Sequence, residues 1–527
     1  MSFIMNKIIL DDKSLCDLEC LLDGYFYPLS TFMDFNDWQN VCKNMRLTNG
    51  NFFPLPINLA CTKQFKKNDI VYLADETNYI IASMQVENIY KPDIDWECSN
   101  AYGTTDTNHP YVKYKNSQKD KYYISGHLTK IANFRHYDFE NHRMKPSEVK
   151  QYFKEHNWKT IVGFQTRNPM HKAHYELTKY ALSKTNEEEA KLFLNPVVGE
   201  TQSVDIDYHT RVHCYKKILK KYNNNVLLGL LPLAMRMAGP KEACLHALIR
   251  KNYGCTHFVV GRDHAGPSFK TKNGESFYGP YDAQDLLFKH AKEINIKPIV
   301  SKMIVYNKSK NIYQPIDDID KDDEILKLSG TEVRHRLKEG IKIPNWFSFP
   351  EVVSILQKSV KQRGICYYFI GLSGAGKTTY ANMLKIKLLE TYPFKEITIL
   401  DGDVIRQNLS KGLGFKKEDR STNVQRVGYV ASEIVKHGGI AICANIAPYD
   451  KDRLINRKLI EDCGGVYKEI WVNTSLDVCI KRDVKGLYKL ALEGKIKQFT
   501  GISDPFENPS QPDFIIENEN YNIENII

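Results

Sequence analysis

The largest concentration of chemically useful side chains lies in the stretch QTRNPMHKAH, at positions 165–174. Residues 160–164, just before it, are short, β-branched and apolar, which predicts a buried strand, and residues 174–182 have helical spacing. A strand-to-helix junction presents backbone N–H groups, to which the Arg, Asn, Gln and His side chains add further donors. This arrangement predicts a phosphate or nucleotide site, where imidazoles can donate to oxygens that gain charge during a reaction.

Two other interpretations of this stretch stay open from the residues alone. Pro169 is also typical of the first turn of an ordinary helix, in which case the two histidines would be surface residues. His171 and His174 are three residues apart, so they share one helix face and could bind a metal ion. Against a metal site, no third ligand stands at a diagnostic spacing, and Arg167 would repel a cation.

Residues from about 151 to 345 alternate between short apolar segments and helical stretches. This alternation predicts a parallel sheet with crossover helices, in which ligands bind beyond the carboxyl ends of the strands. A second polar motif, Gly-Arg-Asp-His at 261–264, follows the apolar run 258–260 at such an end. A capped helix start would explain its Gly and Asp, but not its Arg and His.

An independent nucleotide motif follows an apolar strand near residue 370. Residues 371–379, GLSGAGKTT, match the complete G-x-x-x-x-G-K-[ST] pattern of a P-loop. The N–H groups of such a loop hold the β-phosphate, Lys377 reaches the β- and γ-oxygens, and the Thr378 hydroxyl binds Mg²⁺. A further strand, 397–400, leads into Asp-Gly-Asp at 401–403, where carboxylates can place a metal ion and align an attacking hydroxyl.

The composition narrows the class of protein. A chain of 527 residues, 42% of them apolar, suffices for roughly two to four domains. The 73 basic and 63 acidic residues give a net charge of +10 without a dense basic block, so nucleic-acid binding is not indicated. The 12 cysteines form no CxxC pair, and neither a basic leader nor a run of 18 apolar residues is present. We therefore expect a soluble cytoplasmic protein that binds no membrane, with import into an organelle left open.

The stretch 165–174 resembles the active-site segment of the ATP sulfurylase (sulfate adenylyltransferase) family, a variant of the HxGH-type nucleotidyltransferase signature. The resemblance continues in LPLAMRMAGP at 231–240, in the segment 241–267 that ends in GRDHAGP, and in LSGTEVR at 328–334. Residues 24–29 are similar to the N-terminal domain of the same family, a small β-rich, PUA-like fold. One departure is the loop 200–205, where many relatives carry a Lys and a Gly, so its contribution stays open.

In that family a sulfate oxygen attacks the α-phosphorus of ATP, releasing pyrophosphate and forming adenylylsulfate (APS). The catalytic residues that the resemblance implies are Thr166, Arg167, Asn168, His171 and His174, the two histidines by stabilising the phosphates. The implied sulfate-binding residues are Gln165, Arg167 and, through its backbone N–H, Ala265. The implied ATP-binding residues are Gln165, Asn168, Arg236, Gly261, Arg262, Asp263, His264 and Ile304.

Residues 362–527 resemble the adenylylsulfate kinase family, which transfers the γ-phosphoryl group of ATP to the 3′-hydroxyl of APS and forms 3′-phosphoadenylylsulfate (PAPS). The similar segments are 400–426, 445–449 and 481–507. The predicted ATP-binding residues are Gly371, Ser373, Gly374, Ala375, Gly376, Lys377, Thr378, Thr379 and Arg482. The implied APS-binding residues are Asp403, Arg406, Phe415, Arg420, Asn423, Ile446, Lys485 and Phe499.

Within this second site we assign catalysis to Lys377 and Asp403, with Asp403 orienting the 3′-hydroxyl, and Mg²⁺ binding to Thr378 and Asp401. Position 447 is Ala, where some relatives carry a Ser that can be phosphorylated. The resemblance therefore implies direct in-line transfer without a phosphoserine intermediate.

The fold class that we expect is multidomain α/β. The predicted domains are a β-rich PUA-like domain at 1–150, a Rossmann-like HxGH-type nucleotidyltransferase domain at 151–345, a linker at 346–361 and a P-loop kinase domain at 362–527.

The predicted function is therefore the activation of sulfate to APS and then to PAPS, by a sulfate adenylyltransferase and an adenylylsulfate kinase in one chain. The expected ligands are ATP, sulfate, APS and PAPS, with Mg²⁺ as the cofactor that accompanies ATP and no tightly bound protein metal. We also expect a homo-oligomer, a dimer or larger, that binds no nucleic acid.

An alternative is a monofunctional ATP sulfurylase whose C-terminal domain is an allosteric module that binds PAPS, as in fungal relatives with a degraded P-loop. A third hypothesis is an enzyme that runs in reverse and makes ATP from APS.

Overall fold

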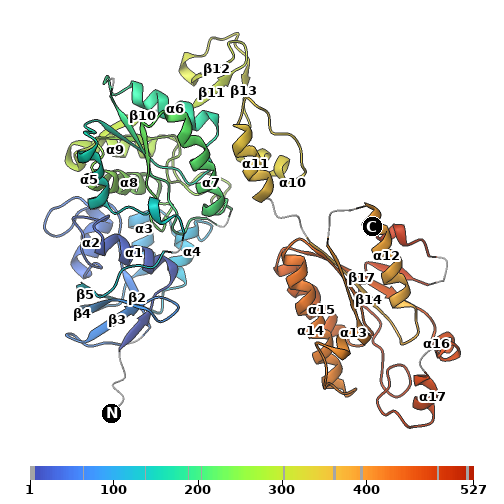
Figure 1. The fold of residues 1–527 in the computed structure, drawn as a ribbon. Coiled ribbons are helices and arrows are strands. Elements are labelled where there is room, and N and C mark those ends of the chain that lie inside the picture. The colour runs from blue at the N-terminus through green and yellow to red at the C-terminus, as the bar shows by residue number, and fades with distance from the viewer. Residues whose placement is uncertain are drawn as a thin grey trace. The chain divides into compact units, whose positions relative to one another are not determined.

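A computed structural model gives the fold of this chain (Figure 1). It describes residues 6–62, 64–136, 138–187, 189–202, 204–300, 303–359, 364–391, 396–483, 486–517 and 521–527. The internal contacts divide the chain into two compact units, residues 1–359 and 360–527.

The first unit begins with a mixed five-stranded sheet in the order β1-β3-β4-β5-β2. Its strands are β1 (Lys7–Ile9), β2 (Leu59–Cys61), β3 (Ile70–Ala74), β4 (Ile80–Tyr90) and β5 (Tyr122–Lys130). Neighbouring strands are antiparallel except for the parallel pair of β1 and β3. The helices of this part are α1 (Asp12–Leu22), α2 (Phe35–Asn44), α3 (Ile94–Tyr102) and α4 (Pro110–Asn116).

A parallel five-stranded sheet follows in the same unit, in the order β10-β9-β6-β7-β8. Its strands are β6 (Ile161–Phe164), β7 (Lys191–Leu194), β8 (Val226–Leu228), β9 (His257–Val260) and β10 (Lys297–Val300). The chain moves outward from β6 to β7 and β8, and then returns to the other side of β6 with β9 and β10. The carboxyl ends of β6 and β9 are thus neighbours at the point where the strand order reverses, which is where ligands bind in such sheets.

The helices around this sheet are α5 (Pro146–Glu155), α6 (Lys172–Ser183), α7 (Tyr208–Leu219), α8 (Gly239–Tyr253) and α9 (Asp282–Ile294). Helix α8 is buried on nearly all sides and contacts α3, α5 and α9. It has a Pro in its first turn and ends at Gly254, which adopts a left-handed φ of 97°, as glycine does readily. Three of its buried polar residues, Glu242, His246 and Arg250, recur at every fourth position and therefore share one face.

The first unit ends with a three-stranded antiparallel sheet and two helices. The sheet has the order β12-β11-β13, and its strands are β11 (Ile304–Asn307), β12 (Ile312–Pro315) and β13 (Ile325–Leu326). The helices are α10 (Gly330–Lys338) and α11 (Pro350–Ser359), and α11 packs on α7. Most of the segment 346–361, which we predicted to be a linker, is therefore a packed helix. The domain boundaries themselves stay a prediction.

The second unit is a parallel sheet in the order β15-β16-β14-β17-β18. Its strands are β14 (Ile365–Ile370), β15 (Ile397–Asp401), β16 (Ile440–Ala444), β17 (Val466–Val472) and β18 (Phe514–Ile516). Its helices are α12 (Lys377–Thr391), α13 (Gly402–Gln407), α14 (Lys417–Lys436), α15 (Asp450–Asp462), α16 (Leu476–Arg482) and α17 (Leu487–Leu492). Hydrophobic side chains on both faces of β14 and β16 are buried, as expected for central strands of a parallel sheet.

The strand predictions agree with this topology. The predicted strand at 160–164 is β6, and the predicted strand at 397–400 is β15, which extends one residue further. Among the described residues, no helix is long and apolar enough to cross a membrane.

A buried ion pair connects α1 to the segment that precedes α8. Arg236 donates from Nη2 to both carboxylate oxygens of Asp17, at 2.7 Å each, and from Nη1 to the Ala234 carbonyl at 2.9 Å. Arg236 is fully buried and Asp17 nearly so. Removal of either partner of such a buried, bidentate pair is unfavourable, because the remaining charged group then has neither water nor an opposite charge beside it.

We therefore predict that Asp17→Asn destabilises the first unit by about 3–5 kcal/mol, the usual cost of removing one partner of a buried pair. The measurement is thermal unfolding of the full chain, followed by tryptophan fluorescence. Asp12→Asn is the matched control, because Asp12 is an exposed carboxylate in the first turn of the same helix. Equal midpoints for the two variants would contradict a stabilising role for the pair.

Candidate active sites

The first candidate site is a pocket of about 350 Å³ at the carboxyl ends of β6 and β9. The loop after β6 supplies one wall and the loop after β9 supplies another, so the topology brings together two motifs that are about 100 residues apart in the sequence. The predicted residues that line the pocket are Gln165, Thr166, Arg167, Asn168, His174, Gly261, Arg262, Asp263, His264, Ala265 and Ile304. His171 and Arg236 are not among its lining residues.

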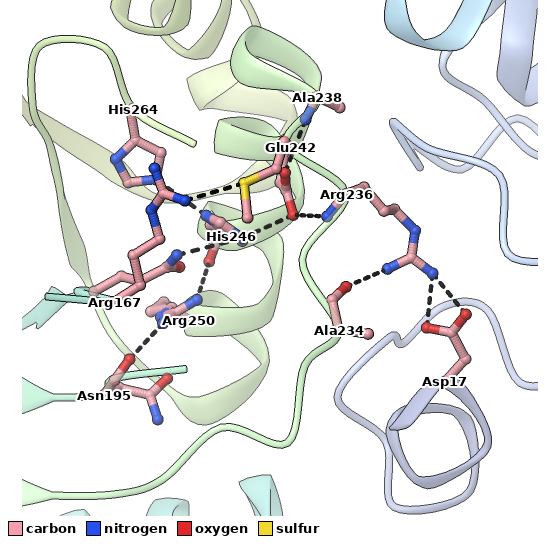
Figure 2. A network of polar contacts seen from close by, with 12 residues as sticks. Asp17, Arg167, Asn195, Ala234, Arg236, Ala238, Glu242, His246, Arg250 and His264 are labelled. Carbon is pink, nitrogen blue, oxygen red and sulfur yellow. Dashed lines mark hydrogen bonds and ion pairs between the residues drawn. The ribbon is translucent and has the colours of Figure 1, made fainter. Parts of the chain in front are cut away.

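Arg236 requires a correction. We predicted that this arginine contacts ATP, but its guanidinium is fully buried against Asp17 on the N-terminal side of α8 (Figure 2). The ion pair neutralises the charge that would attract a phosphate. In this structure Arg236 therefore joins the segment before α8 to α1.

Arg167 is held on three sides within the pocket wall. Its Nη1 donates to Asp205 Oδ2 and to the Met237 sulfur, each at 3.3 Å, and its Nη2 donates to the Gly266 carbonyl at 3.1 Å. Asp205 belongs to the segment 200–205, whose sequence departs from the family pattern. That loop is also attached to the β9 side, because Gln202 exchanges two hydrogen bonds with Ser268, of 2.9 and 3.3 Å. Asp205 thus helps to orient a predicted sulfate-binding residue.

His171 and His174 lie at the start of α6. The backbone N–H of His171 donates to Nδ1 of His174 at 3.2 Å, and Nδ1 of His171 is 2.9 Å from the hydroxyl of the buried Ser348. Burial and then the neighbouring His174 lower the pKa of His171 to about 3, and burial lowers the pKa of His174 to about 4. Both rings are therefore neutral at pH 7 and act there as hydrogen-bond donors or acceptors, not as cations.

A polar network lies behind this pocket, on the buried helix α8 (Figure 2). Glu242 accepts hydrogen bonds from the backbone N–H groups of Arg236, at 2.8 Å, and Ala238, at 2.9 Å. Arg250 donates to the Asn195 carbonyl at 2.7 Å, and burial lowers its pKa to about 10. No role was predicted for these residues of α8 from the sequence. The available signal was the recurrence of Glu, His and Arg at every fourth position of the helix.

The second candidate site is the loop between β14 and α12. Gly374 and Gly376 adopt φ values of 75° and 106°, which L-residues with side chains rarely adopt. The Thr378 hydroxyl donates to Asp401 Oδ2 at 2.7 Å, so the two predicted Mg²⁺ ligands lie side by side. Lys377 donates to the carbonyls of Gly371 and Leu372, at 3.0 and 2.7 Å.

Other predicted residues of this site lie close to the same loop. Arg482 donates to the Gly374 carbonyl at 3.3 Å. Asp403 follows Asp401 at the start of α13, and its backbone N–H donates to Asp401 Oδ1 at 3.0 Å. A pocket of about 530 Å³ lies nearby beyond β17, but the only residue of the P-loop in its lining is Leu372. The phosphate-binding chemistry therefore rests on the loop and not on that larger pocket.

The predicted APS-binding residues differ in how far they are exposed to a ligand. The Arg406 guanidinium lies 4.5 Å from the centre of the Phe415 ring, and 62% of Phe415 is exposed, so this ring can stack on a ligand. Arg420 is instead buried and bonded to Thr500, Tyr449 and Asp504. Ile446 follows β16, Asn423 is a buried residue of α14, and Phe499 contacts Tyr488 edge to face. Lys485 lies outside the described residues.

Comparison with known proteins follows the same division of the chain. A family model described as ATP-sulfurylase matches residues 140–359, one described as adenylylsulphate kinase matches 363–517, and one described as a PUA-like domain matches 2–133. The sulfate adenylyltransferase of Aspergillus terreus is 41% identical over 534 residues, which cover 99% of this chain and 92% of that protein. The chain belongs to the sulfate adenylyltransferase family. The sulfate adenylyltransferase of Neurospora crassa is similar to the same extent, at 41% identity and the same coverage.

A solved structure is similar over the same length. The hexameric APS kinase from Thiobacillus denitrificans has a TM-score of 0.74 and 28% identity, and the match covers 99% of this chain and 92% of that one. The predicted fold class is confirmed: a PUA-like domain, an ATP sulfurylase domain and a P-loop kinase domain in one chain. The two enzyme domains support sulfate activation through APS to PAPS, and they favour that function over a C-terminal domain that is only regulatory.

The pKa values of the two α6 histidines lead to a prediction about pH. Below about pH 6.5 the unfolded chain takes up protons at these rings, whereas the folded chain does so only near pH 4 and pH 3. The folded state therefore loses stability as the pH falls through this window, by about 1.4 kcal/mol per histidine and pH unit. In His171→Gln, the thermal midpoint should fall less steeply between pH 6.5 and 5 than in the wild type. A wild-type slope in His171→Gln would contradict a His171 that stays neutral in the folded chain.

Proposed function

We propose that both sites of this chain are catalytic, so that one polypeptide converts ATP and sulfate to APS and then phosphorylates APS to PAPS. The observation that carries this proposal is the pocket at the ends of β6 and β9, which is lined by both the motif predicted to bind sulfate and the motif predicted to bind the nucleotide. The complete P-loop of the second unit, with Thr378 hydrogen-bonded to Asp401, supports the second activity.

In the first reaction, two anions have to approach one another, so donors and positive charge must offset their repulsion. Arg167 and Gln165 would hold sulfate, with the Ala265 backbone as a further contact. Thr166 and Asn168 would align the reacting groups, while Gly261–His264 and Ile304 hold the nucleoside. The neutral rings of His171 and His174 would donate N–H groups to phosphate oxygens as charge develops there.

In the second reaction, the N–H groups of residues 371–379 and the ammonium of Lys377 would hold the ATP phosphates, with Arg482 beside them. Thr378 and Asp401, which are hydrogen-bonded to one another, would hold Mg²⁺ through their oxygens, and the ion would neutralise phosphate charge. Asp403 would orient the 3′-hydroxyl of APS, and Phe415 and Phe499 would contact APS. Ala447 has no hydroxyl, so the phosphoryl group would pass directly to APS.

We further propose that Mg²⁺ accompanies ATP and is not held by a permanent protein site. In the described parts of the chain, no group of three or more His, Cys, Asp and Glu residues could hold a metal ion. We also propose a homo-oligomer, since the similar APS kinase from Thiobacillus denitrificans is described as hexameric.

Complementary variants test the two assignments. Lys377→Ala should lower PAPS formation by roughly 100-fold or more, because a charged contact to the transferred phosphoryl group is lost, and should leave pyrophosphate release intact. His171→Ala should lower pyrophosphate release and leave PAPS formation from added APS unchanged. The two rates are measured separately, with sulfate or APS as the substrate.

Matched controls are available on the same helices or close to them. Lys385→Ala changes another lysine of α12, and His213→Ala changes an exposed histidine of α7, so neither should alter either rate. If a folded Lys377→Ala or His171→Ala variant lost both activities, the assignment of two independent sites would be wrong.

A further inference from the structure

His246 is a fully buried residue of α8 (Figure 2), and it lies close to one residue of each of the two loops that line the first pocket. Its Nδ1 is 3.1 Å from Nε2 of His264, which belongs to the loop after β9. Its Nε2 is 3.4 Å from the side-chain nitrogen of Gln165, in the loop after β6, and 3.5 Å from Oε1 of Glu242. A single ring therefore adjoins one residue of each ligand-binding motif and one buried carboxylate.

Glu242 determines which nitrogen of His246 carries the proton. Burial opposes ionisation of Glu242, but hydrogen bonds from His246 and from the backbone of Arg236 and Ala238 hold its pKa below the ordinary value. The carboxylate is thus an acceptor only, and Nε2 of His246 has to be the N–H that faces it. Burial keeps His246 neutral by lowering its pKa, so its Nδ1 carries a lone pair.

The proton on His264 follows from the same reasoning. Because Nδ1 of His246 can only accept, Nε2 of His264 has to donate across the 3.1 Å contact. Burial, together with His246, Arg250 and Arg167, keeps the pKa of His264 well below its ordinary value. His264 is therefore neutral, and its Nδ1 is the acceptor that remains for a ligand.

Gln165 depends on His246 in a different way. Its Oε1 is buried and has no hydrogen-bond partner among the described residues, while its amide nitrogen faces Nε2–H of His246, so that two donors meet. Exchange of the amide oxygen and nitrogen, which are similar in size, lets the oxygen share the Nε2–H of His246 with Glu242 as a bifurcated hydrogen bond. The amide N–H groups then lie on the side away from His246, where they can donate to an anion.

We propose that His246 is a positioning residue of the sulfurylase site, which orients Gln165 through its Nε2–H and His264 through its Nδ1. The proposal rests on the function proposed for this pocket. It assigns one hydrogen bond of the ring to the sulfate-binding side and the other to the nucleotide-binding side.

Two substitutions of His246 each remove a different hydrogen bond of the ring. In His246→Gln the amide N–H reaches the position of Nε2, so the contacts with Glu242 and Gln165 are kept and the one with His264 is lost. In His246→Asn the amide oxygen reaches the position of Nδ1, so the contact with His264 is kept and the other two are lost. We expect His246→Gln to raise the KM for MgATP, and His246→Asn to raise the KM for sulfate, each by roughly three- to tenfold.

The measurement is the initial rate of pyrophosphate release by the full chain, with either substrate varied. Partial unfolding would lower the maximal rate but would not change the ratio of the two KM values. This ratio therefore tests the proposal even if a variant is destabilised. His257→Gln is the matched control, a buried histidine of β9 that is absent from the pocket lining, and it should change neither KM. Equal changes of both KM values in either variant, no change in either variant, or the reverse assignment would overturn the proposal. A wild-type chain that released no pyrophosphate would instead refute the proposed function.

Discussion

A carboxylate that is completely removed from water has to be surrounded by hydrogen-bond donors, and Glu242 imposes this requirement on the first unit. It accepts from two backbone N–H groups before α8, which fixes the segment that carries Arg236, and Arg236 in turn is paired with Asp17 of α1. On the opposite side, Glu242 adjoins His246 and thereby the pocket. One buried charge thus connects the N-terminal sheet region, the central helix and the two loops that form the candidate site.

Electrostatics and topology act together at that site. The reversal of strand order beside β6 brings two loops to one edge of the sheet, and Arg250 lies buried under them with carbonyl partners at Asn195 and His246. The Cβ of any residue other than glycine at position 163 would lie 2.8 Å from the Cγ of Arg250, so β6 needs a glycine where the arginine passes. A positive group held in this way favours anions in the pocket without having to reorient when they bind.

The sequence predicted most of what depends on local patterns. The strand at 365–370 and the P-loop after it could be located because apolar runs, glycines and the Lys-Thr pair are contiguous. Contacts between distant residues could not be predicted in this way. Asp17 and Arg236 are separated by 219 positions, and nothing local distinguishes an arginine that binds phosphate from one paired with a remote aspartate. The packing of α11 on α7 was missed for the same reason, since a short amphipathic helix between two domains resembles a linker in sequence.

The value of two activities in one chain follows from mass action. Each tenfold reduction in the concentration of APS adds about 1.4 kcal/mol to the driving force for its formation, so a kinase that consumes APS pulls the first reaction forward.

The most direct test is product analysis of the wild-type chain with ATP, Mg²⁺, sulfate and pyrophosphatase, in which APS and PAPS are separated. Two active sites predict PAPS as the main product. Accumulation of APS without PAPS would contradict this account, and would mean that the second unit is not catalytic despite its complete P-loop.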